Sequence, residues 1–394
     1  NADEPTFENT IVALDKSGEI LDRVSGVFFA LTEADTNDQL MELETKFASM
    51  LSEHSDNIYL NLDLYKRVAA VHDKEAEGKI QLTTEQHYLL DKYYKGFVRA
   101  GAALDSAKQA RLREINKELA TLTIEFGNHV LADNNAYLLV VDDKKDLEGL
   151  PETVVEGASQ EAKAHGKEGK WVFTLQESSR LPLLQYAKNR ELRKDIYQAY
   201  INLGNHGDAN DNKELLKRIL TLRLEKARLM GYSNYAEYQL AENMAKTPEN
   251  ALDLLYKLWG YAIGKAKSEA AQLQAIMDRE GKGEKLEAWD WWYYAEKLRK
   301  EKYDLNEDEI KPYFSQEDVH NGLCYVVNKL YGVTLTPTDS ISVYNPDVKT
   351  YIVNDGDGSL LGIFYSDYMP RSNKRSGAWM SNFREASADV RPLI

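Results

Sequence analysis

The chain of 394 residues has a single cysteine, Cys324, and no long apolar run. One cysteine excludes an intrachain disulfide framework and a cysteine-rich metal site. Cys324 lies in the apolar helical stretch HNGLCYVVNKLYG, where a buried, inert thiol is favoured over a nucleophile. No stretch approaches the roughly 20 apolar residues that cross a bilayer, so we expect no membrane partner.

Basic residues are fewer than acidic residues. The 49 Lys and Arg stand against 64 Asp and Glu, which gives a formal net charge of -15. Nucleic acid binding needs a basic footprint, so this balance argues against DNA or RNA as a partner. The first residues, NADEPTFENT, contain no signal peptide and are not an initiator start. We expect a soluble protein of the cytoplasm or periplasm, and the compartment stays undecided.

The common catalytic motifs are missing. The seven histidines all lie more than five positions apart, so the helical His-Glu-x-x-His zinc motif is absent. There is no Gly-x-Ser-x-Gly elbow for a hydrolytic serine. The stretch NDGDGS is similar to a calcium loop, but Leu360 stands where that loop needs glycine and Ser366 where it needs glutamate. A tight Asp-Gly turn between two strands is the better interpretation.

Helical periodicity fills most of the chain. Apolar residues recur three, four or seven positions apart, which predicts a mainly α-helical fold. Thr83 and Gln86 form a capping pattern before a helix that is expected to end at Gly101. Pro248 opens a helix of roughly thirty residues that ends before Gly281.

Two regions look like strands instead. The runs AYLLVV and KWVFTLQ within residues 136–177, separated by a Gly/Lys-rich loop over 157–169, predict a small sheet insertion. A second β-hairpin or small sheet is expected near residues 340–394. We therefore expect two parts: a helical region 1–250 with the insertion, and a helical region 251–394 that leads into the hairpin.

The patch from Asn354 to Met380 carries the second hairpin. SLLGIFYSDY and RSGAWMSNF are expected to pair as antiparallel strands, with Pro370 in the connection. A free edge of such a hairpin can bind an extended peptide by strand addition, unless both edges are covered internally. The last residues, VRPLI, look like the start of a further strand.

An aromatic cluster precedes this patch. For the tryptophans Trp289, Trp291 and Trp292, packing where two helices cross is favoured over lining a groove.

Several sequence blocks occur in an order that resembles one known family. They are FENTIVALDKSGEILDRV, DNIYLNLDLYKRVAAV, NRELRKDIYQAY, LRLEKARLMGYSNYAEYQLAENMAKTPE, WDWWYYAEKLRKEKYDLNEDEIKPYF, NKLYGV and DGSLLGIFYSDYMPRSNKRSGAW. The ordered set is similar to the zinc metallopeptidase family of thimet oligopeptidase and bacterial peptidyl-dipeptidase, and it spans nearly the whole chain. A minor departure is Leu203, where many relatives would carry a basic residue.

The resemblance implies a mainly helical, cleft-forming fold and metal-assisted hydrolysis of short peptides. In the family, two histidines and a downstream glutamate hold zinc, and a motif glutamate activates the bound water. The zinc helix follows the GAW strand, beyond the end of this sequence. The resemblance thus implies the N-terminal portion of a zinc oligopeptidase, closest to the peptidyl-dipeptidases. We expect it to be inactive alone, with the C-terminal catalytic part of the same protein as its partner and no catalytic or metal-binding residue of its own.

The resemblance also implies where substrate would bind. The backbone of Gly377, Ala378 and Trp379 corresponds to the family's edge strand beside the scissile bond. Tyr365 and Arg371 are additional candidates, although either can instead stabilise the hairpin. Two alternatives stay open at this point: a non-catalytic helical peptide-binding or scaffold protein, and an independently folding lid domain.

Overall fold

The computed structural model describes residues 3–281, 283–304 and 307–384, so the stretch VRPLI lies outside the described residues. The chain divides into two compact units. Unit 1 contains residues 1–128 and 212–252, and unit 2 contains residues 129–211 and 253–394. The division at residue 250 that we expected from the sequence stays a prediction.

Unit 1 is built from helices. Its elements, with two long helices that continue into unit 2, are the π-helix η1 (Phe7–Val12), α1 (Ala13–Asp15), α2 (Glu19–Ala34), α3 (Asp38–Tyr59), α4 (Leu62–Ala76), α5 (Thr84–Ala100), α6 (Ser106–Ala136), α10 (Lys213–Leu229), α11 (Tyr235–Leu240) and α12 (Pro248–Arg279). Helix α5 has the predicted ends: Thr83 and Gln86 close a capping box, and Gly101 follows with φ +97°. The core joins η1 to α4 and α5 through Phe7, Ile11, Val68, Val71, Leu90, Phe97 and Ala102.

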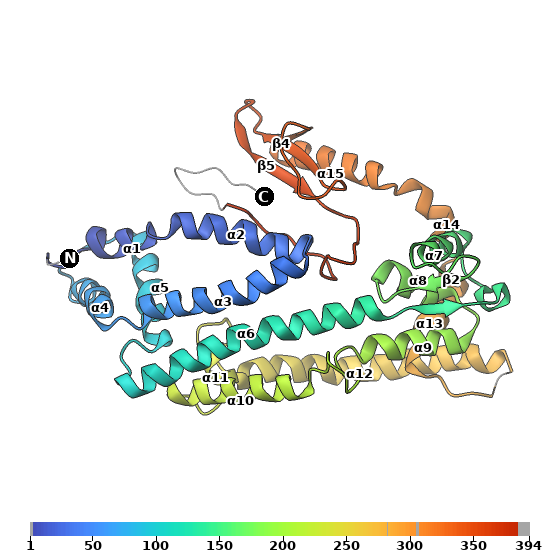
Figure 1. Ribbon diagram of the computed structural model, residues 1–394, viewed down its shortest axis with the longest axis horizontal. Helices are drawn as coiled ribbons and strands as arrows, with labels where there is room; N and C mark the ends of the chain where they lie inside the picture. Colours follow the sequence, from blue (N-terminus) through green and yellow to red (C-terminus); the bar gives the residue numbers. More distant parts are fainter. Residues whose placement is uncertain (1–2, 282, 305–306, 385–394) are drawn as a thin grey trace. The chain divides into compact units, whose positions relative to one another are not determined.

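Unit 2 combines helices with two small antiparallel sheets, which confirms the predicted fold class (Figure 1). Its further elements are β1 (Leu139–Val141), η2 (Lys144–Leu147), α7 (Glu152–Ala164), β2 (Trp171–Phe173), α8 (Glu177–Tyr186), α9 (Arg190–Ile201), η3 (Ala288–Asp290), α13 (Trp291–Tyr303), α14 (Glu307–Ile310), η4 (Lys311–Tyr313), α15 (Gln316–Tyr331), β3 (Thr334–Pro337), β4 (Lys349–Asn354) and β5 (Leu360–Ser366).

The first sheet pairs β1 with β2, as the strand-like runs predicted. The prediction of a loop over 157–169 is wrong for most of this range, because helix α7 continues to Ala164. Its buried positions Val155, Ala158 and Ala162 recur three or four residues apart. This apolar stripe makes the segment helical despite its glycine and lysine content.

The second sheet has the strand order β3-β4-β5. The predicted Asp-Gly turn is confirmed, since the N–H of Gly358 donates to the carbonyl of Asp355 at 2.9 Å between β4 and β5. The predicted pairing of SLLGIFYSDY with RSGAWMSNF is wrong. Strand β5 pairs with β4, whose sequence KTYIVN is rich in β-branched residues, and residues 375–383 form no strand. A short turn keeps β4 next to β5, whereas the chain after β5 turns away.

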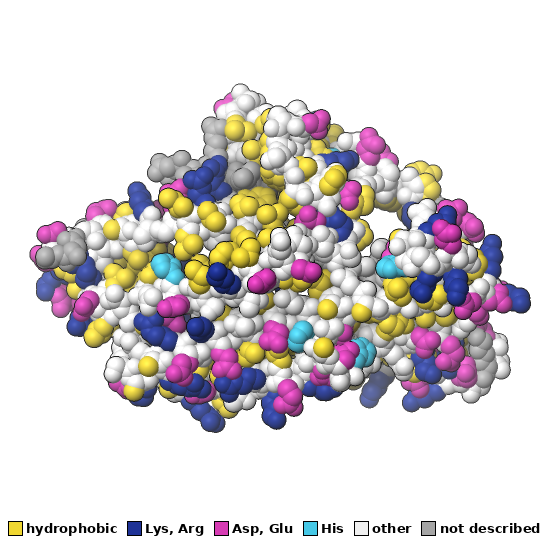
Figure 2. Space-filling model, in the orientation of Figure 1, with side chains coloured by type: hydrophobic (Ala, Val, Ile, Leu, Met, Phe, Trp, Pro, Cys, Tyr) yellow, Lys and Arg dark blue, Asp and Glu magenta, His cyan; other side chains and the backbone are white. Residues whose placement is uncertain are grey.

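Trp289, Trp291 and Trp292 are half-buried, and the last two pack against buried clusters, as we favoured. Trp292 lies against the cluster around Phe173 and Leu184, and Trp291 lies against Tyr293 and Tyr294. Other apolar side chains stay on the surface. Hydrophobic groups gather over α2 and α3 in the space-filling view (Figure 2). Ile20 and Val24 of α2 and Met50 of α3 are exposed. Within the described residues, we find no helix with both the length and the apolar character of a membrane span.

Candidate substrate-binding site

The predicted substrate-contact residues lie on β5 and on the segment that follows it, residues 367–383. One edge of β5 is occupied by β4, and among the described residues no strand pairs with the other edge. An unpaired edge offers backbone donors and acceptors to an extended chain. The geometry of this region therefore depends on what holds the 367–383 segment in place.

Asp367 organises this segment. Its side chain is about nine-tenths buried, at 10% exposure. Both terminal nitrogens of Arg371 donate to its two oxygens, at 2.8 and 2.7 Å. The Tyr344 hydroxyl donates to Oδ2 at 2.9 Å, and Lys374 Nζ lies 3.1 Å from Oδ1. Three donors from different positions thus converge on one carboxylate.

These donors also determine the charge of Asp367. Burial alone pushes the pKa of its carboxyl upward, but hydrogen bonds from Arg371, Lys374 and Tyr344 outweigh burial and hold the pKa below its ordinary value. The carboxylate is therefore ionised at neutral pH. Lys374 is fixed further, because its Nζ donates to the carbonyls of Asp367 and Met369.

Arg371 and Tyr365 both have partners within the protein. Arg371 engages Asp367, and its side chain is 12% exposed. The Tyr365 hydroxyl donates to the carbonyl of Ser342 at 3.2 Å, and its ring meets Phe383 edge-on at 5.5 Å. Burial raises the pKa of Tyr365. These contacts fit the stabilising role that the sequence left open for both residues, and substrate contact by either stays a prediction.

Gly377, Ala378 and Trp379 are exposed, and their contact with a substrate backbone stays a prediction. Gly377 has a backbone φ of +111°, which residues with a side chain rarely adopt. The ring of Trp379 lies 5.7 Å from Lys374 Nζ, which connects this stretch to the Asp367 network.

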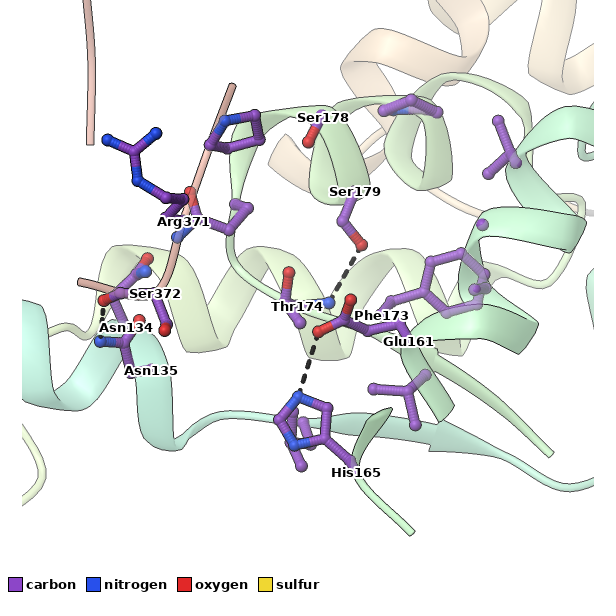
Figure 3. A pocket seen from close by; sticks show the side chains of 18 of the residues that line it. Asn134, Asn135, Glu161, His165, Phe173, Thr174, Ser178, Ser179, Arg371 and Ser372 are labelled. Atoms are coloured by element: carbon purple, nitrogen blue, oxygen red, sulfur yellow. Dashed lines mark hydrogen bonds and ion pairs between the residues drawn. The ribbon is translucent and has the colours of Figure 1, made fainter. Parts of the chain in front are cut away.

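A cavity lies beside the start of this segment, between α7 and α8, and we call it the α7–α8 cavity (Figure 3). Its volume is about 460 Å³. Its lining comes from the end of α6, from α7, from β2, from the first turns of α8, from Lys311 and from residues 370–372. The amide of Asn135 donates to the carbonyl of Ser372 at 2.6 Å and closes one side.

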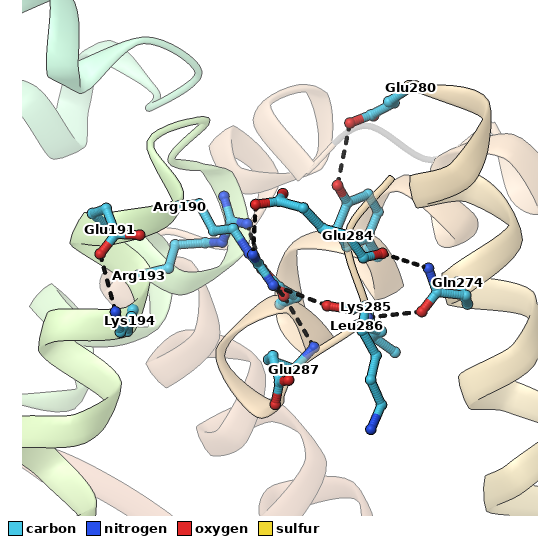
Figure 4. Close-up of polar contacts among 12 residues, drawn as sticks. Arg190, Glu191, Arg193, Lys194, Gln274, Glu280, Glu284, Lys285, Leu286 and Glu287 are labelled. Atoms are coloured by element: carbon cyan, nitrogen blue, oxygen red, sulfur yellow. Dashed lines mark hydrogen bonds and ion pairs between the residues drawn. The ribbon is translucent and has the colours of Figure 1, made fainter. Parts of the chain in front are cut away.

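A second polar cluster in unit 2 surrounds the fully buried Asp290. Figure 4 shows Arg190 and Arg193, which belong to this cluster. Arg190 Nη2 and Arg193 Nη2 each donate to this carboxylate at 2.7 Å. Burial pushes the pKa of Asp290 upward, and the bonds from Arg190 and Arg193 more than offset it, so the pKa stays below the ordinary value. Arg193 also lies over the ring of Tyr293, at 4.2 Å. The cluster connects α9 to η3 and α13, and both carboxylate oxygens of Asp290 accept hydrogen bonds within it.

The described residues do not provide a metal site. No group of three or more His, Cys, Asp and Glu side chains gathers within residues 3–281, 283–304 and 307–384. The histidines have separate surroundings: His72 stacks on Tyr94, His165 contacts Glu161, and His320 contacts Cys324. The described residues therefore do not fit a zinc ion.

Sequence reasoning overlooked Asp367, Lys374 and Tyr344. The signal for two of them was available, because Asp367 and Arg371 stand four positions apart and Lys374 follows three later. Tyr344 is 23 residues from Asp367 in the chain, and only the fold brings it close.

Comparison with known proteins identifies the family to which the chain is similar. Residues 183–392 match the family model described as Peptidase family M3. The chain is 38% identical to dipeptidyl carboxypeptidase of Escherichia coli over 98% of its own length and 57% of that protein. It is 32% identical to oligopeptidase A of Escherichia coli, with 96% and 56% covered. For the organellar oligopeptidase A of Arabidopsis thaliana the identity is 34%, with 96% and 48% covered. The chain thus spans about half the length of these relatives.

Proposed function

The chain belongs to peptidase family M3, and we propose that it is the N-terminal part of a zinc-dependent peptidyl-dipeptidase, which releases C-terminal dipeptides from short peptides. The observation that carries this proposal is the similarity to dipeptidyl carboxypeptidase, which extends over 98% of the chain at 38% identity. The identity to oligopeptidase A is 32% over a similar span. The difference favours dipeptide release over cleavage at internal bonds.

In this proposal the chain supplies substrate positioning. An extended peptide lies along the exposed backbone of Gly377, Ala378 and Trp379, where N–H and C=O groups bind it without regard to its side chains. The Asp367 network holds the 367–383 segment in one conformation, so that less entropy is lost when the peptide binds. Tyr365 and Arg371 border this stretch. Zinc would supply an activated water, and its ligands would come from residues outside this sequence.

The proposed partner is therefore a C-terminal catalytic part that corresponds to the remainder of the relatives. Exposed apolar side chains support such a partner. On α15, Val326, Leu330 and Tyr331 are at least half exposed, and on α12 Leu255, Tyr256 and Trp259 are more than half exposed. Contiguous exposed apolar groups mark surfaces that another polypeptide covers.

The test is to read the gene beyond Ile394 and to assay the complete product. We expect a downstream His-Glu-x-x-His, and chelator-sensitive release of dipeptides from an oligopeptide with a free C-terminus but not from its C-terminal amide. Cleavage of both peptides at internal bonds would contradict dipeptide release and would indicate oligopeptidase activity instead. A complete product without the motif and without hydrolysis would favour the non-catalytic peptide-binding protein.

A further inference from the structure

We propose that the α7–α8 cavity binds a small zwitterion of the amino-acid class, either a free amino acid or a dipeptide. Its volume of about 460 Å³ falls within the range of about 300–1,000 Å³ that is common for small-molecule sites. The proposal does not rest on the proposed peptidase activity, because its evidence is the lining of the cavity and its readout is binding.

The first observation is an amide at the cavity wall that has no protein partner among the described residues. Asn134 lines the cavity and is 7% exposed. Within the described part of the chain, its side chain makes no hydrogen bond, whereas neighbouring Asn135 is engaged with Ser372. Figure 3 shows Asn134 at the side of the cavity near Ser372, where its amide can pair with a peptide or carboxyl group of a ligand.

The second observation is a site for a carboxylate. Helix α8 begins beside the cavity, and its N-cap residue Gln176 makes no side-chain capping bond. The first N–H groups of a helix favour an anion when no side chain caps them. Lys311 lines the same cavity and forms no ion pair among the residues that the structure describes. A carboxylate can therefore find an ammonium group and free backbone donors together.

The third observation is a site for an ammonium group. Glu161 lines the cavity from α7, and its Oε1 contacts His165 Nε2 at 3.1 Å. Its other oxygen has no protein donor in the described ranges. Apolar groups, among them Val154, Phe173 and Pro182, complete the lining. The cavity thus has surfaces that can bind an anion, a cation, an amide and an apolar group. An amino acid or a dipeptide carries groups that complement these surfaces.

Gly157 provides a way to fill the cavity without disturbing its surroundings. It lies within α7 and lines the cavity, and a Cβ atom at this position would meet no atom within 4 Å. A leucine at this position would occupy ligand space, and it favours helix more than glycine does. Gly264 in α12 also has open space around it and is not among the residues that line the cavity, so Gly264→Leu is a matched control.

The experiment is isothermal titration calorimetry of the 394-residue chain with glycyl-leucine and with leucine. The probe that binds more tightly shows whether the cavity takes a dipeptide or a free amino acid. We expect one molecule per chain, with at least tenfold weaker binding of glycyl-leucinamide and of N-acetyl-glycyl-leucine. Gly157→Leu should abolish binding, Asn134→Leu should weaken it at least tenfold, and Gly264→Leu should leave it unchanged. Lys311→Gln changes an exposed side chain and should weaken binding several-fold even if a buried variant fails to fold.

Three results would overturn the proposal. The first is no binding of either probe at millimolar concentration. The second is unchanged binding by folded Gly157→Leu or by Lys311→Gln. The third is a crystal structure, soaked at the same concentration, in which ordered water alone satisfies Asn134.

Discussion

Arg371 and Asp367 form a bidentate ion pair, with both terminal guanidinium nitrogens within 2.8 Å of a carboxylate oxygen. This fork-to-fork geometry is among the strongest polar contacts that side chains make. Asp367 lies directly after β5, and Arg371 lies six residues before the exposed Gly377–Trp379 backbone. We infer that the pair positions the 367–383 segment, and the predictions below test this inference and the packing around it.

Replacing Asp367 with asparagine should loosen the 367–383 segment. The change keeps the shape of the side chain, but it removes the charge that Arg371 and Lys374 face. A hydrogen bond to a charged group contributes about 1.5–3 kcal/mol, so we expect a loss of stability of that order. Hydrogen exchange of residues 367–383 should become faster. Glu269→Gln, which breaks the exposed i,i+4 pair with Lys265, should change stability by less than about 0.5 kcal/mol. Equal effects would contradict a positioning role for Asp367.

The buried Asp290 should make stability depend on pH in the acid range. Its pKa is lower in the folded protein than in the unfolded chain, where it is about 3.9. The contribution is therefore fully present above the unfolded pKa and is lost as the pH falls through the folded pKa. Urea unfolding from pH 7 to pH 3 should show Asp290→Asn destabilised by about 3–5 kcal/mol at neutral pH. The difference from the unchanged protein should shrink in acid.

A difference between the two proteins that is constant over this pH range would contradict the assigned direction of the Asp290 shift. Asp253→Asn, on an exposed side of α12, serves as the control and should alter neutral-pH stability by no more than about 0.5 kcal/mol.

Ala378→Pro should raise KM of the complete enzyme. Proline removes the backbone N–H that we propose to bind the substrate. One such hydrogen bond is worth about 0.5–1.5 kcal/mol, which corresponds to a roughly two- to tenfold rise in KM. Ala378→Gly keeps the N–H and is the matched control. Identical peptide kinetics for both variants would remove position 378 from the substrate site.

Gly101→Ala should destabilise unit 1 more than Gly78→Ala does. Both glycines have positive φ, at +97° and +71°, so both substitutions introduce backbone strain of about 1–3 kcal/mol. Only at Gly101 would the new Cβ crowd Leu104 and Leu112, at 2.9 Å each. Overpacking adds about 1–3 kcal/mol. Thermal unfolding of the two variants separates crowding from strain, and equal losses would show that the side chains move aside.

The sequence by itself determined the helical class, many helix ends and one turn. Thr83, Gln86 and Gly101 define α5 because capping involves residues within one turn of the helix end. The Asp355–Gly358 turn follows in the same way from local backbone preferences. The ordered blocks also identified the family, since they extend over nearly the whole chain.

Tertiary structure decided what depends on residues far apart in the chain. The sequence favoured RSGAWMSNF as the partner of β5, and the fold pairs β5 with β4 instead. It contained Tyr344 and Asp290 without indicating that one would meet Asp367 and the other Arg190, 100 positions away. The α7–α8 cavity likewise needs segments from residues 134 to 372. Caps and turns are local in sequence, whereas strand pairing, buried ion pairs and cavities arise only when distant segments fold together.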